Sequence, residues 1–226
     1  MNSYVITKEE VVIEFEKVML SGTLSLPESS TGLVIFAHGS GSSRYSPRNI
    51  YVAEFLNQHG LATLLLDLLL SEEDQLFTNR FNIRLLTSRL AAAVRWAKLN
   101  KKIAHLPIGL FGASTGAAAA LQLAGSENKP IKPDILAVIS RGGRPDLTDL
   151  DYLTAVKAAT LLIVGSKDHS VIAFNEYAFK YLQCERELKI VEGATHLFEE
   201  PGALKKVAEL SCEWFKKYLH ANLLAY

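Results

Sequence analysis

One serine in the sequence lies in a setting that could make it a nucleophile. Ser114 is the centre of Gly112-Ala113-Ser114-Thr115-Gly116, which follows the apolar run 108–111 and precedes four alanines. This G-x-S-x-G pattern is typical of a sharp turn from a strand into a helix, which raises the serine hydroxyl above a sheet edge. The glycines on either side allow the strand and the helix to approach closely. The pattern therefore predicts nucleophilic catalysis at Ser114.

A serine hydroxyl is a weak nucleophile until a base removes its proton, and that base needs a third group to fix its orientation. The sequence offers both partners. Asp168 follows the apolar run 161–165, and His196 follows the expected strand 188–191. Because the carboxyl ends of parallel strands meet at one edge of a sheet, we expect Ser114, Asp168 and His196 to converge there as a catalytic triad.

Less reactive interpretations of the same residues remain open. Asp168 could cap the next helix, and Asp146 is the rival carboxylate, although Pro-Asp before a helical stretch is typical of a turn. His196 could be a surface-loop histidine. The turn at 112–116 could be a tightly packed strand-turn-helix without chemistry, and its G-x-x-x-G spacing also occurs in membrane helix pairs. A proline, four glycines and several polar side chains make the segment around it a poor membrane span.

Negative charge that develops on an attacked carbonyl oxygen needs hydrogen-bond donors close by. The backbone amide of Thr115 is one candidate, because the helix that begins there directs its positive end toward the serine. The second candidate is the amide of Ser40 in His38-Gly39-Ser40-Gly41, which follows a buried strand, and His38 is expected to shape this loop. Nucleotide binding by the loop is not expected, since Arg44 stands where a dinucleotide motif has its third glycine.

Four further side chains could contact a substrate. Arg141 and Arg144 follow the expected strand 135–140, and together with Arg44 they could bind a substrate carboxylate through their guanidinium groups. Phe198 is expected to edge an open cleft. Solvated or structurally paired arginines are the alternative interpretation.

The elements that must position these residues alternate between short apolar strands and longer amphipathic helices. This alternation implies a parallel sheet with helices on both faces. The expected strands are 11–15, 20–26, 33–37, 61–67, 108–111, 135–140, 161–165 and 188–191, and the expected helices are 47–58, 81–99, the segment after Ser114, 174–182 and 203–219. We predict an α/β fold with a mostly parallel, twisted, eight-stranded sheet and an antiparallel N-terminal strand pair, in a single domain over residues 1–226. Only about twenty residues connect 140 to 160, which leaves no room for a large cap.

Composition excludes several function classes. The 226 residues include 24 Lys plus Arg and 24 Asp plus Glu, so net charge favours neither nucleic acid nor an anionic membrane as partner. The start of the chain shows no secretory signal, which makes the cytoplasm the expected location. Cys184 and Cys212 lack metal-binding spacing and are expected to be reduced, so no metal site is expected. The expected partner is a small ester-type substrate, and the oligomeric state is left open.

Four motifs together resemble the α/β-hydrolase superfamily, especially its small, capless dienelactone-hydrolase-like branch. They are H-G-x-G at 38–41, G-A-S-T-G at 112–116, G-S-K-D at 165–168 and G-A-T-H-L-F at 193–198, and the order Ser114, Asp168, His196 is the superfamily's order. The similarity runs from about residue 20 to the end. One departure is that dienelactone hydrolases proper carry cysteine in this turn, so their lactone specificity does not transfer.

The resemblance implies a cofactor-independent serine hydrolase that cleaves a small carboxylic ester, thioester or lactone through an acyl-enzyme on Ser114. Two alternatives stay open. The same triad could transfer the acyl group to an alcohol, an amine or peroxide, as an acyltransferase or perhydrolase does. The fold could also serve as a non-catalytic binding protein.

Overall fold

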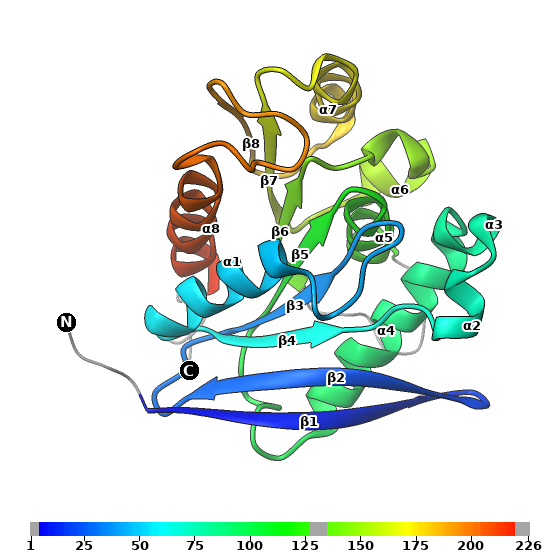
Figure 1. Cartoon of the computed structure of the whole chain (residues 1–226), viewed down its shortest axis with the longest axis vertical. Helices are drawn as coiled ribbons and strands as arrows, with labels where there is room; N and C mark the ends of the chain where they lie inside the picture. Colours follow the sequence, from blue (N-terminus) through cyan, green and yellow to red (C-terminus); the bar gives the residue numbers. More distant parts are fainter. Residues whose placement is uncertain (1–4, 127–134, 220–226) are drawn as a thin grey trace.

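The computed structural model describes residues 5–126 and 135–219, and its framework is an eight-stranded sheet (Figure 1). The order across the sheet is β1-β2-β4-β3-β5-β6-β7-β8. β2 runs antiparallel to both β1 and β4, whereas β3 to β8 are parallel to one another, which confirms the predicted fold. The strands are β1 (Ile6–Phe15), β2 (Val18–Pro27), β3 (Leu33–Ala37), β4 (Ala62–Leu66), β5 (Ile108–Ala113), β6 (Ile135–Arg141), β7 (Ala159–Gly165) and β8 (Arg186–Val191).

Strands in the middle of the sheet are buried on both faces. Every residue of β3, β4, β5 and β7 is buried, which is the environment that an uninterrupted apolar run favours. The edge strand β1 differs, because Ile13 is its one buried residue and it carries four charged side chains, Lys8, Glu9, Glu10 and Glu14. The candidate residues were expected at the carboxyl ends of the parallel strands, and the buried central strands form that edge of the sheet.

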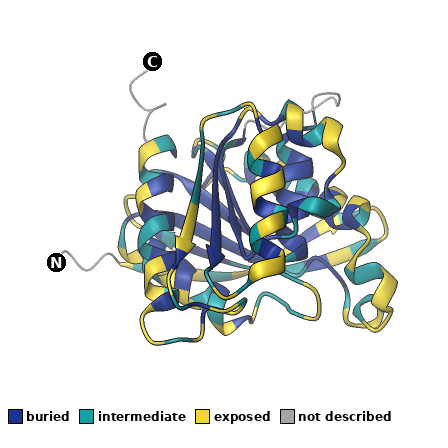
Figure 2. Ribbon diagram, turned by 90° about the horizontal axis from the view of Figure 1, so that it is seen from above, coloured by how far each residue is buried: buried dark blue, intermediate teal, exposed yellow. Residues whose placement is uncertain are grey.

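Helices cover the two faces of the sheet as separate layers (Figures 1 and 2). α1 (Pro47–Gln58) and α8 (Ala203–Leu219) pack together over one face, around Phe36, Phe111 and Phe215. α4 (Ile83–Leu99) and α5 (Thr115–Ala124) pack together over the other face. Within the two ranges that the structure describes, no helix combines the length and apolar character needed to cross a bilayer.

Two segments differ from the elements expected from the sequence. α7 (His169–Tyr181) begins at His169 rather than near residue 174. Its buried face consists of Val171, Asn175 and Ala178, and the polar Asn175 interrupts the apolar pattern that would have marked this start. Asp168 therefore directly precedes a helix. The segment between β4 and α4, for which no element was expected before residue 81, contains two single-turn helices, α2 (Ser71–Asp74) and α3 (Phe77–Arg80).

The connection between β6 and β7 is short, as expected. It holds one turn of 3-10 helix, η1 (Pro145–Leu147), and the short helix α6 (Leu150–Ala155), all within the described part of the chain. Because these elements pack on α5 and α7, they do not form a cap over the sheet edge. The prediction that this connection holds no large cap is confirmed.

Candidate active site

Ser114 lies in a strained turn between β5 and α5. Its backbone has φ 51° and ψ −119°, a conformation that an L-residue adopts only when its surroundings enforce it. The two glycines of the motif explain how the turn packs. A Cβ on Gly112 would lie 2.6 Å from the Ala117 nitrogen, and a Cβ on Gly116 would overlap the carbonyl oxygens at the end of β3. The turn thus needs glycine at both positions, and it presents a half-buried serine at the sheet edge.

Asp168 and His196 are joined directly. The carboxylate Oδ2 of Asp168 lies 2.6 Å from Nδ1 of His196. Asp168 occupies the N-cap position of α7, yet its side chain makes no capping hydrogen bond. The carboxylate therefore accepts a hydrogen bond from Nδ1–H, which leaves Nε2 of the neutral ring able to accept a proton.

A short segment after β6 contacts both Ser114 and His196. The Ser114 amide donates to the carbonyl of Arg141 at 3.2 Å, and the amide of Arg144 donates to the Ser114 carbonyl at 3.1 Å. Between these contacts, Gly142 has φ 51°, and a Cβ there would lie 3.4 Å from Nδ1 of His196. Among the described residues no hydrogen bond joins the Ser114 hydroxyl to the imidazole. Such a bond commonly tightens only when substrate is present.

The loop after β3 lies against the serine and is held by His38. A Cβ on Gly39 would lie 3.0 Å from Cβ of Ser114. Nδ1 of the buried His38 lies 2.9 Å from the Gly39 carbonyl, and the Leu68 amide donates to its Nε2 at 2.9 Å. Nδ1 must therefore carry the proton, and burial lowers the pKa of this imidazole. The sequence-based expectation that His38 shapes the loop agrees with these contacts.

The two amides expected to bind an oxyanion are not used by the fold. The Ser40 amide donates to no acceptor among the described residues, and Thr115 is the first residue of α5, where an amide has no acceptor within the helix. The chain has no cis peptide bonds among the residues described. Because C=O and N–H point in opposite directions across a trans peptide, the bond from His38 to the Gly39 carbonyl also sets the direction of the Ser40 N–H.

The three candidate arginines lie in different electrostatic settings. Arg44 pairs with Asp67, and its amide donates to the same carboxylate at 2.7 Å. Arg144 forms two hydrogen bonds to Asp146, of 2.8 and 2.7 Å. These carboxylates raise the pKa of both guanidinium groups. Arg44 and Arg144 are therefore structurally paired arginines, which was the alternative interpretation of the sequence. Arg141 is buried, and none of the described residues pairs a carboxylate with it.

Phe198 is not at the edge of an open cleft. It is 1% exposed, has φ 57° and packs in the core layer with α8. Leu197 takes the exposed position next to it. The sequence did not show which side chain of this loop is buried, because the positive φ at Phe198 turns the Phe198 side chain toward the core.

Two residues at the start of α1 belong to the site's surroundings but have no motif. Arg48 pairs with Glu199 at 3.1 Å, and the side chain of Asn49 is buried and accepts a hydrogen bond from Arg141 at 3.3 Å. Polar residues are common in the first turn of any helix, so the sequence carried no signal for them.

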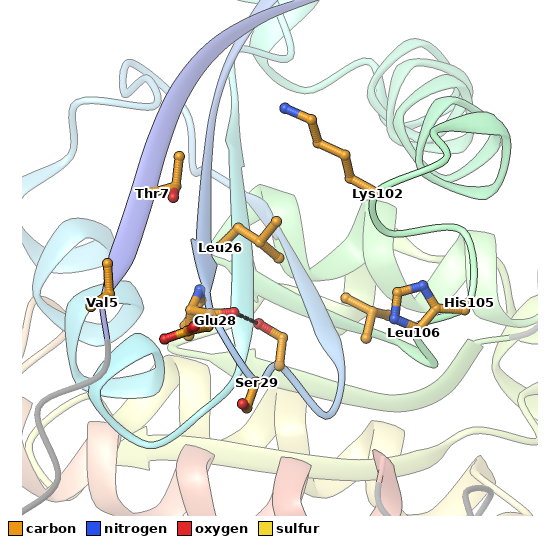
Figure 3. A pocket seen from close by; sticks show the side chains of 10 residues that line it. Val5, Thr7, Leu26, Glu28, Ser29, Lys102, His105 and Leu106 are labelled. Carbon is orange, nitrogen blue, oxygen red and sulfur yellow. Dashed lines mark hydrogen bonds between the residues drawn. The ribbon is translucent and has the colours of Figure 1, made fainter.

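A cavity of about 390 Å³ lies away from this edge (Figure 3). Its lining includes Ser29, which precedes β3, and Leu106, which precedes β5. These positions are at the amino-terminal ends of the parallel strands, opposite Ser114. The cavity is therefore separate from the candidate active site.

The strand order and the serine turn at the carboxyl edge define an α/β hydrolase. The chain belongs to the dienelactone hydrolase family, whose model matches residues 32–221. Among solved structures, a dienelactone hydrolase from Anabaena variabilis is 52% identical, with a TM-score of 0.89 and coverage of 95% of this chain and 99% of that chain. The family resemblance expected from the sequence motifs is confirmed.

More distant structures share the fold. Est1E from Butyrivibrio proteoclasticus is 19% identical, with a TM-score of 0.73 and coverage of 92% of this chain and 98% of that one. The esterase domain of a Rhodothermus marinus protein is also 19% identical, with a TM-score of 0.76 and coverage of 94% and 99%.

Two curated relatives are longer proteins whose name does not refer to ester hydrolysis. Both come from Mycobacterium tuberculosis strains, are named "Putative phosphoribosyl transferase" and are 50% identical to this chain over 211 residues. The match covers 93% of this chain but 46% of each relative. The chain thus spans about half the length of these proteins.

Proposed function

We propose that this protein is a serine hydrolase that cleaves a small carboxylic ester, thioester or lactone through an acyl-enzyme on Ser114. The observation that carries the proposal is the hydrogen bond from His196 to Asp168 at the same sheet edge as the strained serine. An oriented imidazole beside a raised serine is the arrangement that acyl transfer requires. Membership of the dienelactone hydrolase family supports hydrolysis as the reaction.

The reaction begins when Oγ of Ser114 attacks the acyl carbon and its proton moves to Nε2 of His196. Asp168 stabilises the imidazolium that forms. The amides of Ser40 and Thr115 hold the negative oxygen of the tetrahedral intermediate. As the intermediate collapses, the proton passes from His196 to the leaving oxygen or sulfur. Water then attacks the acyl-enzyme by the same steps and restores the serine.

The phosphoribosyl transferase activity in the name of the mycobacterial relatives is not proposed for this chain. The chain matches about half of each of them, so their named activity can belong to the other half. Within the shared half, the residues at the sheet edge are a serine, an imidazole and a carboxylate, which suit acyl transfer. Transfer to an acceptor other than water uses the same residues and is separated from hydrolysis by its products.

The test uses a fluorophosphonate probe together with a substrate panel. Native protein should be labelled stoichiometrically, and Ser114→Ala should not be labelled. Acyl p-nitrophenyl esters, lactones and thioesters should then be hydrolysed by native protein but not by Ser114→Ala. Added alcohols, amines or peroxide would reveal acyl transfer as a new product. If native protein takes up no label and cleaves none of the panel, the fold serves binding and the proposal is wrong.

A further inference from the structure

Asn175 is a polar residue in the middle of a buried helix face. It is 0% exposed, and the other buried residues of α7, Val171 and Ala178, are apolar. Its Nδ2 donates to the Val171 carbonyl at 2.8 Å and to the Gly143 carbonyl at 3.0 Å, whereas its Oδ1 is buried without a partner. An apolar side chain of the same shape would avoid the cost of that oxygen. A polar group therefore stands where packing alone favours an apolar one.

The bond to Gly143 joins the helix to the segment between β6 and η1. Gly143 is buried, and no backbone amide of the described residues donates to its carbonyl. A Cβ on Gly143 would lie 1.9 Å from Oγ of Ser140 and 2.7 Å from Cβ of Ala117, so the backbone here packs directly on β6 and α5. The chain at Gly143 is thus enclosed by two elements and hydrogen-bonded to a third through Asn175.

The same segment contacts the proposed nucleophile and the proposed base. The Arg141 carbonyl accepts from the Ser114 amide at 3.2 Å, and the Arg144 amide donates to the Ser114 carbonyl at 3.1 Å. Between these contacts, Gly142 has φ 51°, and a Cβ there would lie 3.4 Å from Nδ1 of His196. Two consecutive glycines have more backbone freedom than any other pair of residues. Their conformation therefore depends on contacts from outside the segment.

The third catalytic candidate lies at the start of the helix that carries Asn175. Asp168 is the N-cap residue of α7, and Asn175 follows it seven residues later. Seven residues are about two helical turns, which puts both positions on the same side of α7. The bond from Asn175 to Gly143 therefore connects the helix that begins after Asp168 to the segment that holds Ser114.

We infer that Asn175 is a positioning residue, whose hydrogen bond to the Gly143 carbonyl fixes segment 141–144 relative to α7 and so sets the approach of His196 to the Ser114 hydroxyl. The inference rests on the proposed function and adds a residue to its machinery. Asn175 acts through the segment rather than on the reacting atoms, because both of its hydrogen bonds end on backbone carbonyls. A displacement of about 1 Å, caused by a change away from the chemistry, can slow a reaction about 100-fold.

A role limited to stability makes a different prediction. If Asn175 only satisfies buried groups, its replacement lowers the stability of the whole fold, and the molecules that stay folded react at the native rate. If Asn175 positions the catalytic groups, folded molecules react slowly while KM stays near its native value, because the substrate contacts are unchanged. The reaction rate per folded active site therefore separates the two roles.

The experiment measures two reactions of each protein. The first is fluorophosphonate labelling, followed as a second-order rate constant together with the final stoichiometry. The second is hydrolysis of the p-nitrophenyl ester that native protein cleaves fastest, followed as kcat and KM. Urea unfolding confirms that each variant is folded under assay conditions. Asn175→Leu removes the amide at similar size, and Asn175→Asp keeps the shape of the side chain but removes the Nδ2 donor.

Asn57 provides the matched control, because it is a second buried asparagine with two hydrogen bonds from Nδ2. It is 1% exposed, lies near the end of α1 and donates to the Leu61 carbonyl at 2.9 Å and to Oγ1 of Thr63 at 3.0 Å. Leu61 precedes β4, at the amino-terminal edge of the parallel strands and opposite Ser114. Asn57→Leu therefore removes two buried hydrogen bonds away from the catalytic edge.

Asn175→Leu and Asn175→Asp should reach the native labelling stoichiometry about 10- to 100-fold more slowly, and kcat should fall by a similar factor with KM within about threefold of native. Asn57→Leu should keep the native labelling rate and kcat, although it is also destabilised. Folded Asn175 variants that react within about threefold of the native rate would overturn the inference. So would an Asn57→Leu variant that is slowed as much as they are, or a rise in KM at native kcat.

If neither variant folds, Asn175→Ser takes their place. A helical serine donates to the carbonyl four residues earlier, as Ser211 does to Val207 at 2.7 Å. This variant therefore keeps a bond to Val171 and loses the one to Gly143. Slow labelling of Asn175→Ser supports the inference, and labelling at the native rate contradicts it. Native protein that takes up no label contradicts the hydrolase itself, whereas labelled native protein with fast Asn175 variants contradicts the positioning role alone.

Discussion

Asp168 occupies the N-cap position of α7, but its carboxylate lies 2.6 Å from Nδ1 of His196 and makes no capping hydrogen bond. The start of α7 therefore fixes the position of Asp168, although the Asp168 side chain does not cap the helix. A side chain in this position can be altered without loss of a helix-capping bond, so its contribution to catalysis can be measured apart from stability.

Asp168→Asn should lower kcat by about 10⁴-fold, as the equivalent change does in a serine protease, because an amide no longer holds His196 in the tautomer that accepts a proton at Nε2. The free energy of unfolding should change by less than about 0.5 kcal/mol, since Asn is as suitable at an N-cap as Asp. Ester hydrolysis and urea unfolding of the same preparation measure the two quantities. A variant that keeps most of its activity would show that another carboxylate, such as Asp146, supports the base.

Ser114→Gly should stabilise the protein while it abolishes activity. The serine is held at φ 51° and ψ −119°, and backbone strain of this kind costs about 1–3 kcal/mol, part of which glycine relieves. Ser114→Ala is the matched control, because it removes the hydroxyl but keeps the Cβ and the strain. Urea unfolding should place Ser114→Gly about 1 kcal/mol above Ser114→Ala. Equal stabilities would mean that the turn stores no strain.

The neutral form of His38 should make stability depend on pH. Burial lowers its pKa in the folded state below the ordinary value of 6.5. The unfolded chain therefore binds a proton first as the pH falls, so the contribution of His38 is fully present above pH 6.5 and is lost below it. The difference in unfolding free energy between native protein and His38→Gln should shrink between pH 7.5 and about 5.5. A difference that stays constant over this range would contradict a neutral His38.

Protonation of His38 or its removal should also slow the reaction. Its bond to the Gly39 carbonyl sets the direction of the Ser40 amide, so His38→Ala should lower kcat by about 10-fold or more with little change in KM. The full loss of one oxyanion donor costs about a hundredfold to a thousandfold and gives the upper limit. A matched Ser40→Ala variant keeps the backbone N–H and should retain native kcat. If Ser40→Ala is as slow as His38→Ala, the side chain of residue 40 matters rather than its amide.

Gly116→Ala should lower the free energy of unfolding by about 2–3 kcal/mol, because the added Cβ would lie 2.5 Å from the carbonyl oxygen of His38 and the sheet cannot yield there. Gly202→Ala is the control for backbone strain alone. It has φ 81° but nothing within 4 Å of an added Cβ, so the expected loss is only about 1 kcal/mol. Comparable losses in the two variants would argue against close packing at the serine turn.

Local patterns in the sequence determined the elements and the serine turn. Helices at Pro47–Gln58 and Ala203–Leu219 match their sequence-based bounds, since apolar periodicity, a leading proline and long amphipathic stretches act within a few residues of one another. G-x-S-x-G is equally local, because its two glycines permit one close approach of strand and helix. The first turn of α7 was missed because the buried face that begins at Val171 continues with the polar Asn175, which hides the apolar repeat.

Tertiary structure alone decided which charged groups have partners. Asp168 rather than Asp146 contacts His196, because Asp146 is bound by Arg144, and this choice depends on loops that the chain brings together from 28 residues apart. Arg44, Arg141 and Arg144 look alike in the sequence, yet Asp67 pairs with the first and Asp146 with the third. Within residues 5–126 and 135–219, no carboxylate pairs with the second. Charge pairing depends on distances of a few ångströms between segments remote along the chain, and no local pattern encodes such distances.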